Sequence, residues 1–272
     1  MRRRKFGLIG HPIAHSLSPA LFKAGYEGRY PYELVETADF EEAYRRFLEG
    51  YDGINVTTPF KELAYAKADI LSEECKAIGA TNLLIKTPEG VKAYNSDYLG
   101  VRLWLEDIYY KAIRTQADVS SAGEKREDAQ LACKVLIVGT GGAGKAAAAA
   151  AESLGMTVIR MNRTVRDEMT RPLEDFRACF KEADIVIYNI PAAIPGLDDL
   201  TAEDFNPGKP KHVLEANYKN PSFTEKLIGR MQSANPLATY TGGKTWLLYQ
   251  AVTGYEIFTG EKPDLKKMSD VL

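Results

Sequence analysis

The chain has 272 residues, a length that suits one large domain or two modest ones. Its 35 Lys and Arg residues and 37 Asp and Glu residues give a net charge of −2, so no basic excess points to nucleic acid as a partner. Hydrophobic residues make up 45%, enough for a sizeable core, and no apolar run reaches the ~20 residues that span a bilayer. We therefore expect a globular protein that has neither a nucleic-acid nor a membrane partner.

The first residues and the cysteines together predict a cytoplasmic protein. Four basic residues follow Met1, but the apolar stretch after them, 6–9, is too short for a signal peptide. Cys75, Cys133 and Cys179 lie far apart and form no CxxC pair, which is typical of reduced thiols. The three histidines show no metal-ligand spacing, so we expect no metal site.

Over the first hundred residues, short apolar runs alternate with helical patterns. Strands are predicted at 6–9, 32–36, 53–56, 81–85 and 91–94, the last two pairing around a turn at 88–90. Helices are predicted at 19–26, 40–48 and 62–71. This alternation is typical of βαβ units and predicts a largely parallel sheet.

A polar segment, 116–130, follows and predicts a solvated loop or linker. Beyond it a second α/β unit is expected. Its strands are predicted at 135–138, 157–159, 185–187 and 213–214, and its first helix at 146–154. A last helix, 245–258, is expected to return to the first domain. The sequence thus predicts an α/β fold in two parts.

A glycine-rich turn opens the second unit. Gly139-Thr140-Gly141-Gly142-Ala143-Gly144 match G-x-G-x-x-G between an apolar strand and an alanine-rich helix, the context that a dinucleotide fingerprint requires. The three glycines permit a tight turn, the approach of a pyrophosphate and close packing of the helix. The run to Lys145 also fits a P-loop, but Ala146 stands where Ser or Thr would bind Mg²⁺, so that interpretation fails. A turn without a ligand stays open as the alternative.

Asn162-Arg163-Thr164 follow the next predicted strand, near the position where an NAD-binding fold has an acidic residue on the ribose 2′-hydroxyl. A guanidinium can bind a 2′-phosphate through two hydrogen bonds, whereas a carboxylate would repel it. Arg166 lies close by in the sequence. The pattern favours NADP(H) over NAD(H), with an ordinary surface turn as the alternative.

Four polar segments of the first domain, 15–19, 53–61, 79–82 and 94–98, stand at predicted element ends, where ligand sites of α/β sheets collect. Ser16 and Ser18 at a helix start suit a carboxylate, although Ser18 before a proline also fits an ordinary helix cap. Lys61 falls in a first helical turn, where the helix dipole disfavours a cation, and this position favours a role in proton transfer. A solvated surface lysine is the alternative. Asp97 precedes an apolar helical run, so capping alone could explain it.

In this order the segments resemble the shikimate dehydrogenase family, and the resemblance spans nearly the whole chain. The Asn55-Val56-Thr57-Thr58-Pro59-Phe60-Lys61 motif is the most specific match. The other matching pieces are Ser16-Leu17-Ser18-Pro19, Gly79-Ala80-Thr81-Asn82, Asn95-Ser96-Asp97, the glycine loop, Asn162-Arg163-Thr164, Tyr218 with Pro221 and Thr224, and Trp246–Ala251.

This resemblance implies a substrate-binding catalytic domain at 1–102, with 243–272 packing back onto it. It implies a Rossmann-type NADP-binding domain at 103–242 that carries the polar insert 116–130. The implied reaction is the reversible, NADPH-dependent reduction of 3-dehydroshikimate to shikimate, a step of chorismate and aromatic amino-acid biosynthesis. A monomer or a homodimer is expected.

The resemblance also implies a role for each matching residue. Lys61 and Asp97 would form the catalytic pair beside the reacting carbon. The residues implied for the substrate are Ser16 and Ser18 at its carboxylate, Thr57, Asn82 and Gln250 at its ring hydroxyls, and Tyr218 near substrate and nicotinamide. The residues implied for NADP(H) are Gly139, Gly141, Gly142, Ala143, Gly144, Asn162, Arg163 and Thr164.

Some positions depart from the family pattern. Glu215 stands where an Asp is expected, Thr245 where a glycine is usual and Leu83 where a Thr is common. A quinate/shikimate dehydrogenase with relaxed substrate or cofactor choice is the nearest alternative, and it predicts an acidic residue at the Asn162-Arg163 position. A non-catalytic NADPH-binding sensor is a further alternative, and it predicts the loss of the Lys61 and Asp97 pair.

Overall fold

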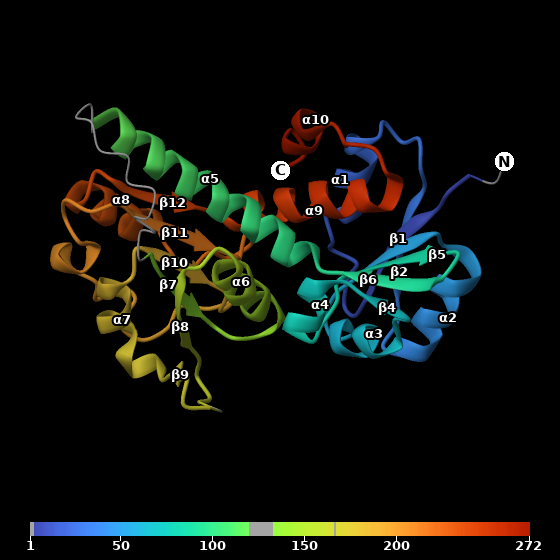
Figure 1. Cartoon of the computed structure of the whole chain (residues 1–272), viewed down its shortest axis with the longest axis horizontal. Coiled ribbons are helices and arrows are strands. Elements are labelled where there is room, and N and C mark those ends of the chain that lie inside the picture. The colour runs from blue at the N-terminus through green and yellow to red at the C-terminus, as the bar shows by residue number, and fades with distance from the viewer. Residues whose placement is uncertain (1–2, 120–132, 166) are drawn as a thin grey trace. The chain divides into compact units, whose positions relative to one another are not determined.

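The computed structural model describes residues 3–119, 133–165 and 167–272, and only the backbone of 109–119. The chain divides into two compact units, Met1–Gly100 with Leu247–Leu272 and Val101–Trp246. Figure 1 labels most of their elements. The domain boundaries expected from the sequence, after 102 and before 243, remain predictions. In the described ranges no helix is both long and apolar enough to cross a membrane.

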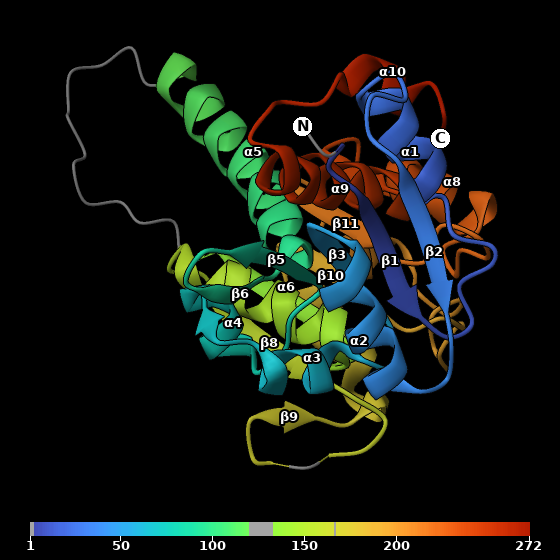
Figure 2. The same ribbon diagram turned by 90° about the vertical axis from the view of Figure 1, so that its right-hand side faces the viewer.

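The first unit is built on a six-stranded sheet in the order β2-β1-β3-β5-β6-β4. Its strands are β1 (Phe6–Gly10), β2 (Tyr32–Glu36), β3 (Gly53–Val56), β4 (Ile70–Leu71), β5 (Leu83–Thr87) and β6 (Gly90–Tyr94). Parallel pairs join β1 to β2 and β3, and β4 to β6, while β5 runs antiparallel to both of its neighbours. Figure 2 shows β1 and β2 side by side.

The helices of this unit follow from local sequence signals. They are α1 (Ser18–Gly25), α2 (Phe40–Gly50), α3 (Lys61–Lys67), α4 (Glu73–Ile78), the start of α5 (Ser96–Val119), most of α9 (Gly243–Thr259) and α10 (Leu265–Ser269). The Asp39 carboxylate caps α2 by accepting from the amides of Glu41 and Glu42, and Phe40 and Phe47 of that helix are buried. The predicted return of the last helix is confirmed, since α9 from Leu247 onward belongs to the first unit.

Two predictions about helix ends are wrong. The helix expected at 62–71 ends at Lys67, because Ile70–Leu71 pair with β6 as the edge strand β4. The polar loop is expected to begin at 116, but α5 continues to Val119, so the predicted start of the loop is too early. Residues 120–130 of that predicted loop lie outside the described residues.

The second unit holds a fully parallel six-stranded sheet in the order β12-β11-β10-β7-β8-β9. Its strands are β7 (Lys134–Val138), β8 (Thr157–Met161), β9 (Thr170–Arg171), β10 (Ile185–Tyr188), β11 (Lys211–Glu215) and β12 (Ala238–Thr241). Its helices after α5 are α6 (Gly142–Ser153), α7 (Phe176–Glu182) and α8 (Glu225–Ala234), with 3-10 turns at Leu173–Asp175 and Ala202–Phe205.

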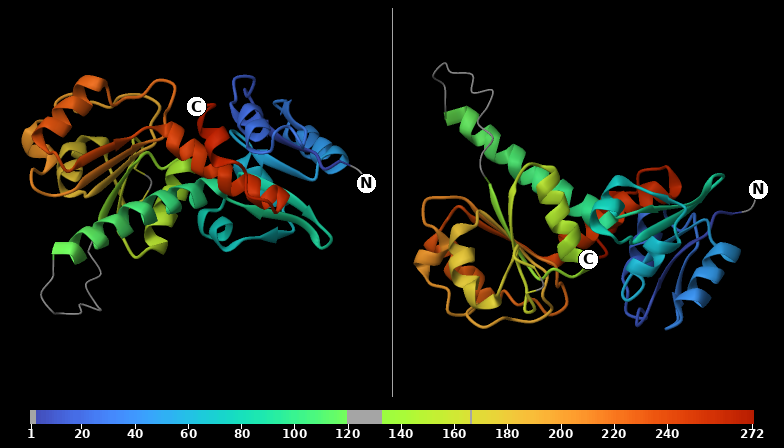
Figure 3. Two further views of the ribbon diagram at one scale, coloured as in Figure 1. Left: turned by 90° about the horizontal axis from the view of Figure 1, so that it is seen from above. Right: turned by 60° about the horizontal axis from the view of Figure 1, so that its bottom comes forward.

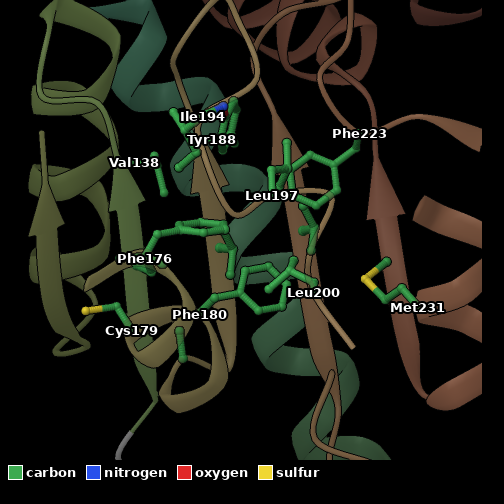
Figure 4. Packing of buried hydrophobic residues seen from close by; sticks show 14 of the residues in the cluster. Val138, Phe176, Cys179, Phe180, Tyr188, Ile194, Leu197, Leu200, Phe223 and Met231 are labelled. Atoms are coloured by element: carbon green, nitrogen blue, oxygen red, sulfur yellow. The ribbon is translucent and has the colours of Figure 1, made fainter. Parts of the chain in front are cut away.

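Both faces of this sheet are covered, as the continuous apolar run of β7 predicts. Figure 3 (right) shows α6 and α7 on opposite sides of the strands. On one face, Val138 and Tyr188 pack with Phe176 and Phe180 of α7 and with Phe223, the cluster drawn in Figure 4. The small side chains of α6 allow a close approach to the other face, where most of its alanines are buried. This doubly wound arrangement confirms the expected Rossmann-type domain.

Candidate active site

Lys61 and Asp97 meet in the first unit. Lys61 is the first residue of α3 and Asp97 lies in the first turn of α5. The Lys61 Nζ is 2.5 Å from Asp97 Oδ2, and the two side chains are 20% and 10% exposed. An ammonium and a carboxylate in this contact can exchange a proton while part of the pair still faces solvent. The structure therefore brings together the two residues that the sequence proposed for catalysis.

Asp97 does not act as the helix cap. Its helix begins one residue earlier, at Ser96, and the Asn95 Oδ1 accepts a hydrogen bond of 3.1 Å from the Tyr98 amide. Asn95 therefore does what a capping residue does, and capping does not explain the acid at position 97.

The 79–82 segment is tied to the start of the same helix. The Asn82 side chain, 5% exposed, donates to Ser96 Oγ over 3.0 Å and accepts from the Ser96 amide over 2.7 Å. Thr81 Oγ1 donates to the carbonyl of Tyr94 over 2.6 Å. These bonds place Asn82 within one residue of Asp97, so two separate sequence motifs form one local structure.

Thr57 and Gln250 approach the same region from two other elements. Thr57 comes directly after β3. Its amide donates to the Ile9 carbonyl, and its carbonyl accepts from the Phe60 amide, each over 2.9 Å. Gln250 lies on α9 where that helix crosses α5. A Cβ at Gly100 would lie 2.7 Å from the Gln250 amide nitrogen, so only glycine permits this crossing. Gly100 is three residues beyond Asp97, about one helical turn away.

Ser16 and Ser18 lie together at the start of α1. Ser16 Oγ donates to Ser18 Oγ over 3.1 Å and accepts from the Ser18 amide over 3.2 Å. The prediction that Ser18 is the N-cap is wrong, because Leu17 holds that position with helical backbone angles and no side-chain cap bond. Ser16 instead satisfies the free amide, which removes capping as the reason for the Ser18 hydroxyl.

In the second unit the glycine loop has the geometry of a dinucleotide turn. Gly139 has a φ of +91°, and a Cβ at Gly144 would lie 1.9 Å from the Gly139 carbonyl oxygen. A Cβ at Gly141 would meet nothing within 4 Å, so there is open space beside the start of α6. Gly142 and Ala143 form the first turn of that helix. Two glycines are thus needed by the fold, and the middle one leaves room for a pyrophosphate.

Asn162, Arg163 and Thr164 leave the sheet at the same edge as the glycine loop, because Val138 of β7 pairs with Met161 of β8. The side chains of Arg163 and Thr164 are exposed. Arg166, noted beside them in the sequence, lies outside the described residues. Exposed donors beside a helix N-terminus at the carboxyl ends of parallel strands fit a 2′-phosphorylated dinucleotide.

Tyr218 lies in the loop between β11 and α8 of the second unit. Partial burial raises the pKa of its hydroxyl. The neighbouring Asn217 orders this loop, since its Oδ1 accepts from the amides of Lys219 and Asn220. Glu215, which stands at the end of β11 in place of the expected Asp, is buried and accepts from the Phe223 amide and from the Tyr240 hydroxyl. That carboxylate is therefore used in holding the loop.

Sequence reasoning missed three residues of the first unit's polar network. The Tyr32 hydroxyl donates to Asn55 Oδ1 over 2.8 Å, and the Tyr255 hydroxyl donates to the Ser18 carbonyl over 3.1 Å. Asn55 could have been found, because it opens the most specific motif. The two tyrosines carry no sequence signal, since neither lies in a polar motif of the kind that marks the other segments. In the ranges that the structure describes, no three His, Cys, Asp or Glu side chains gather as metal ligands would.

Comparison with known proteins assigns the family. A sequence model of the shikimate dehydrogenase substrate binding domain matches residues 8–84. A model of the NAD binding domain of D-isomer specific 2-hydroxyacid dehydrogenases matches residues 109–214. The shikimate dehydrogenase (NADP(+)) of Haloarcula marismortui is 31% identical, and the match covers 97% of this chain and 96% of that protein.

Solved structures agree. The shikimate 5-dehydrogenase of Thermus thermophilus in complex with NADP(H) and shikimate has a TM-score of 0.69 and 27% identity, covering 98% of both chains. The quinate dehydrogenase of Corynebacterium glutamicum in complex with NAD has a TM-score of 0.75 at 21% identity, covering 99% of this chain and 98% of that one, and shares the fold. On the evidence of the site, the fold and these relatives, the chain belongs to the shikimate dehydrogenase family.

Proposed function

We propose that the protein catalyses the reversible, NADP-dependent interconversion of 3-dehydroshikimate and shikimate. The observation that carries this proposal is the contact between Lys61 and Asp97, 2.5 Å from ammonium to carboxylate, in a chain of this family. A carbonyl that is being reduced develops negative charge on its oxygen and needs a proton donor. The pair provides that donor in the first unit, which holds every predicted substrate residue except Tyr218.

Bound NADPH supplies the hydride to the keto carbon when the reaction runs toward shikimate. Lys61 donates a proton to the oxygen of that carbonyl, which becomes a hydroxyl group. Asp97 holds the ammonium in place by its hydrogen bond and stabilises its charge before transfer. In the opposite direction the neutral amine accepts the hydroxyl proton.

The proposed substrate contacts follow the family motif and the geometry of the first unit. Ser16 and Ser18 present two neighbouring hydroxyls at the start of α1 for the carboxylate. Thr57, Asn82 and Gln250 are assigned to the ring hydroxyls. Tyr218 of the second unit is assigned to the substrate by its place in the family motif alone.

NADP(H) is the proposed cofactor, and the described residues fit it. The open space at Gly141 and the first turn of α6 would hold the pyrophosphate. Asn162, Arg163 and Thr164 would hold the adenosine 2′-phosphate, with Arg163 as the charged partner. We further propose that the enzyme is cytoplasmic, since all three cysteines are free thiols. We also propose that it acts as a monomer or a homodimer.

The test is a spectrophotometric assay of cofactor reduction with shikimate and with quinate, each with NADP⁺ and with NAD⁺. Efficient turnover of shikimate with NADP⁺ is the expected result. Comparable kcat/KM with quinate or with NAD⁺ would favour the relaxed dehydrogenase. Cofactor binding without turnover of either substrate would favour the non-catalytic sensor.

A further inference from the structure

Two tyrosines, Tyr255, which is buried, and Tyr32, which is partly buried, lie close to the start of α1. Tyr255 of α9 is 2% exposed and donates its hydroxyl proton to the Ser18 carbonyl over 3.1 Å. Tyr32 of β2 donates to Asn55 Oδ1 over 2.8 Å. The two rings lie edge to face with centroids 5.9 Å apart. The two rings therefore form one aromatic pair, which contacts α1 through Ser18 and β3 through Asn55.

Ser18 is held at two atoms. Its carbonyl accepts from the Tyr255 hydroxyl over 3.1 Å, and its Oγ accepts from Ser16 Oγ over 3.1 Å. Burial raises the pKa of both phenols above the ordinary value. Ser18 is thus fixed at its carbonyl by the Tyr255 hydroxyl and at its side chain by Ser16.

Packing alone does not require these hydroxyls. The Phe22 ring lies 4.8 Å from the Tyr32 ring and 4.8 Å from the Tyr255 ring, so the surroundings are aromatic and apolar. A phenylalanine would fill the same volume without the cost of burying a polar group. The hydroxyls therefore need another reason, and their partners supply one. Ser18 is proposed for the substrate carboxylate, and Asn55 lies two residues before Thr57.

We propose that Tyr32 and Tyr255 are positioning residues that hold the carboxylate-binding serines in register with the rest of the substrate site. This inference rests on the proposed function. Tyr255 connects Ser18 to α9, the helix that carries Gln250 five residues earlier. Tyr32 packs against the Tyr255 ring and connects it to Asn55, in the motif that ends at Lys61. The pair thus fixes the distance between the carboxylate end and the hydroxyl end of the substrate.

Tyr255→Phe and Tyr32→Phe test the proposal by steady-state kinetics. Each should raise the KM for shikimate roughly three- to ten-fold, the worth of one hydrogen bond, while kcat and the KM for NADP⁺ change little. Tyr26→Phe is the matched control. The Tyr26 hydroxyl is also buried and bonds Thr259 Oγ1 over 2.8 Å, but it contacts neither serine. Its loss should lower Tm and leave the KM for shikimate unchanged.

Shikimate methyl ester shows which end of the substrate the tyrosines affect. The ester lacks the negative charge, so the KM penalty of Tyr255→Phe should be smaller for the ester than for shikimate. The inference would be overturned if Tyr255→Phe raised the KM for shikimate and for its methyl ester equally. It would also be overturned if the KM of Tyr255→Phe for shikimate were no different from that of Tyr26→Phe. Wild-type protein that does not oxidise shikimate contradicts the proposed function, whereas active wild type with unaffected variants contradicts this inference alone.

Discussion

The Lys61 ammonium and the Asp97 carboxylate, 36 residues apart in the chain, form a hydrogen-bonded ion pair of 2.5 Å between two helix N-termini. Asp97 lies in a first turn, where the helix dipole favours negative charge. Lys61 lies in another first turn, where the dipole disfavours a cation. The carboxylate offsets that cost, so the lysine is kept at this position by its partner. This arrangement holds a charged proton donor at a place where the helix alone would disfavour it.

Arg163→Ala tests the choice of cofactor. The exposed guanidinium is proposed to bind the 2′-phosphate, so its loss should raise the KM for NADP⁺ sharply and change the KM for NAD⁺ little. A charge-assisted contact of this kind is worth about 1.5–3 kcal/mol. The measurement is the KM for each cofactor at saturating shikimate. Equal effects on the two cofactors would remove Arg163 from the 2′-phosphate site.

Ser16→Ala and Ser18→Ala test the carboxylate site. Both should raise the KM for shikimate and leave the KM for NADP⁺ unchanged. Because Ser16 accepts from the Ser18 amide, Ser16→Ala should also lower Tm, whereas Ser18→Ala should lower it less. Thermal melts beside the kinetics separate the two effects. A Ser18→Ala protein that changes only in Tm would leave Ser18 with a structural role.

Gly144→Ala and Gly141→Ala distinguish the structural role of the glycine loop from its proposed role in binding NADP⁺. A methyl group at position 144 would lie 1.9 Å from the Gly139 carbonyl oxygen, so Gly144→Ala should destabilise the second unit strongly. A methyl group at position 141 meets no protein atom within 4 Å, so Gly141→Ala should fold normally and bind NADP⁺ more weakly. Tm and NADP⁺ affinity by fluorescence titration are the readouts. Normal NADP⁺ binding by Gly141→Ala would contradict the pyrophosphate assignment.

The buried Lys211 should make the free energy of unfolding depend on pH. Its side chain is fully buried, donates to the Phe180 and Ala183 carbonyls, and burial lowers its pKa to about 8 from the ordinary 10.5. The unfolded chain therefore binds the extra proton between pH 8 and 10.5, so this group adds stability as pH rises through that window. The gain is on the order of 2–3 kcal/mol.

The measurement is the free energy of unfolding by denaturant at about pH 8 and about pH 10 for wild type and Lys211→Met. Wild type should gain stability relative to Lys211→Met over this interval. Lys209→Met, which replaces an exposed lysine two residues away, should follow wild type. Parallel pH profiles for wild type and Lys211→Met would show that the buried lysine keeps an ordinary pKa.

The strands and the glycine loop could be predicted because their signals are local. The 32–36 and 53–56 strands have the predicted bounds, and the apolar run 135–138 lies within β7. The end of α3 could not be predicted, since Ile70 and Leu71 become a strand only by pairing with β6. The contact of Lys61 with Asp97 was expected from the family motif, whereas the Tyr32 and Tyr255 hydroxyls depend on tertiary contacts that no short pattern records.

The central claim is that Lys61 donates the proton to the substrate with Asp97 as its partner. Lys61→Ala should lower kcat by ~10²–10⁴, the usual worth of general acid–base catalysis, with a much smaller change in the KM for shikimate. Asp97→Asn keeps the shape of the side chain and should also reduce kcat. The double variant should be far less impaired than the sum of the two, because the residues act as one unit.

Steady-state kinetics of Lys61→Ala at saturating shikimate and NADP⁺, with folding checked by thermal melts, is the most direct test. The account predicts a folded protein that binds both ligands and whose kcat has fallen by at least about a hundred-fold. A folded Lys61→Ala enzyme with a kcat near that of wild type would contradict it.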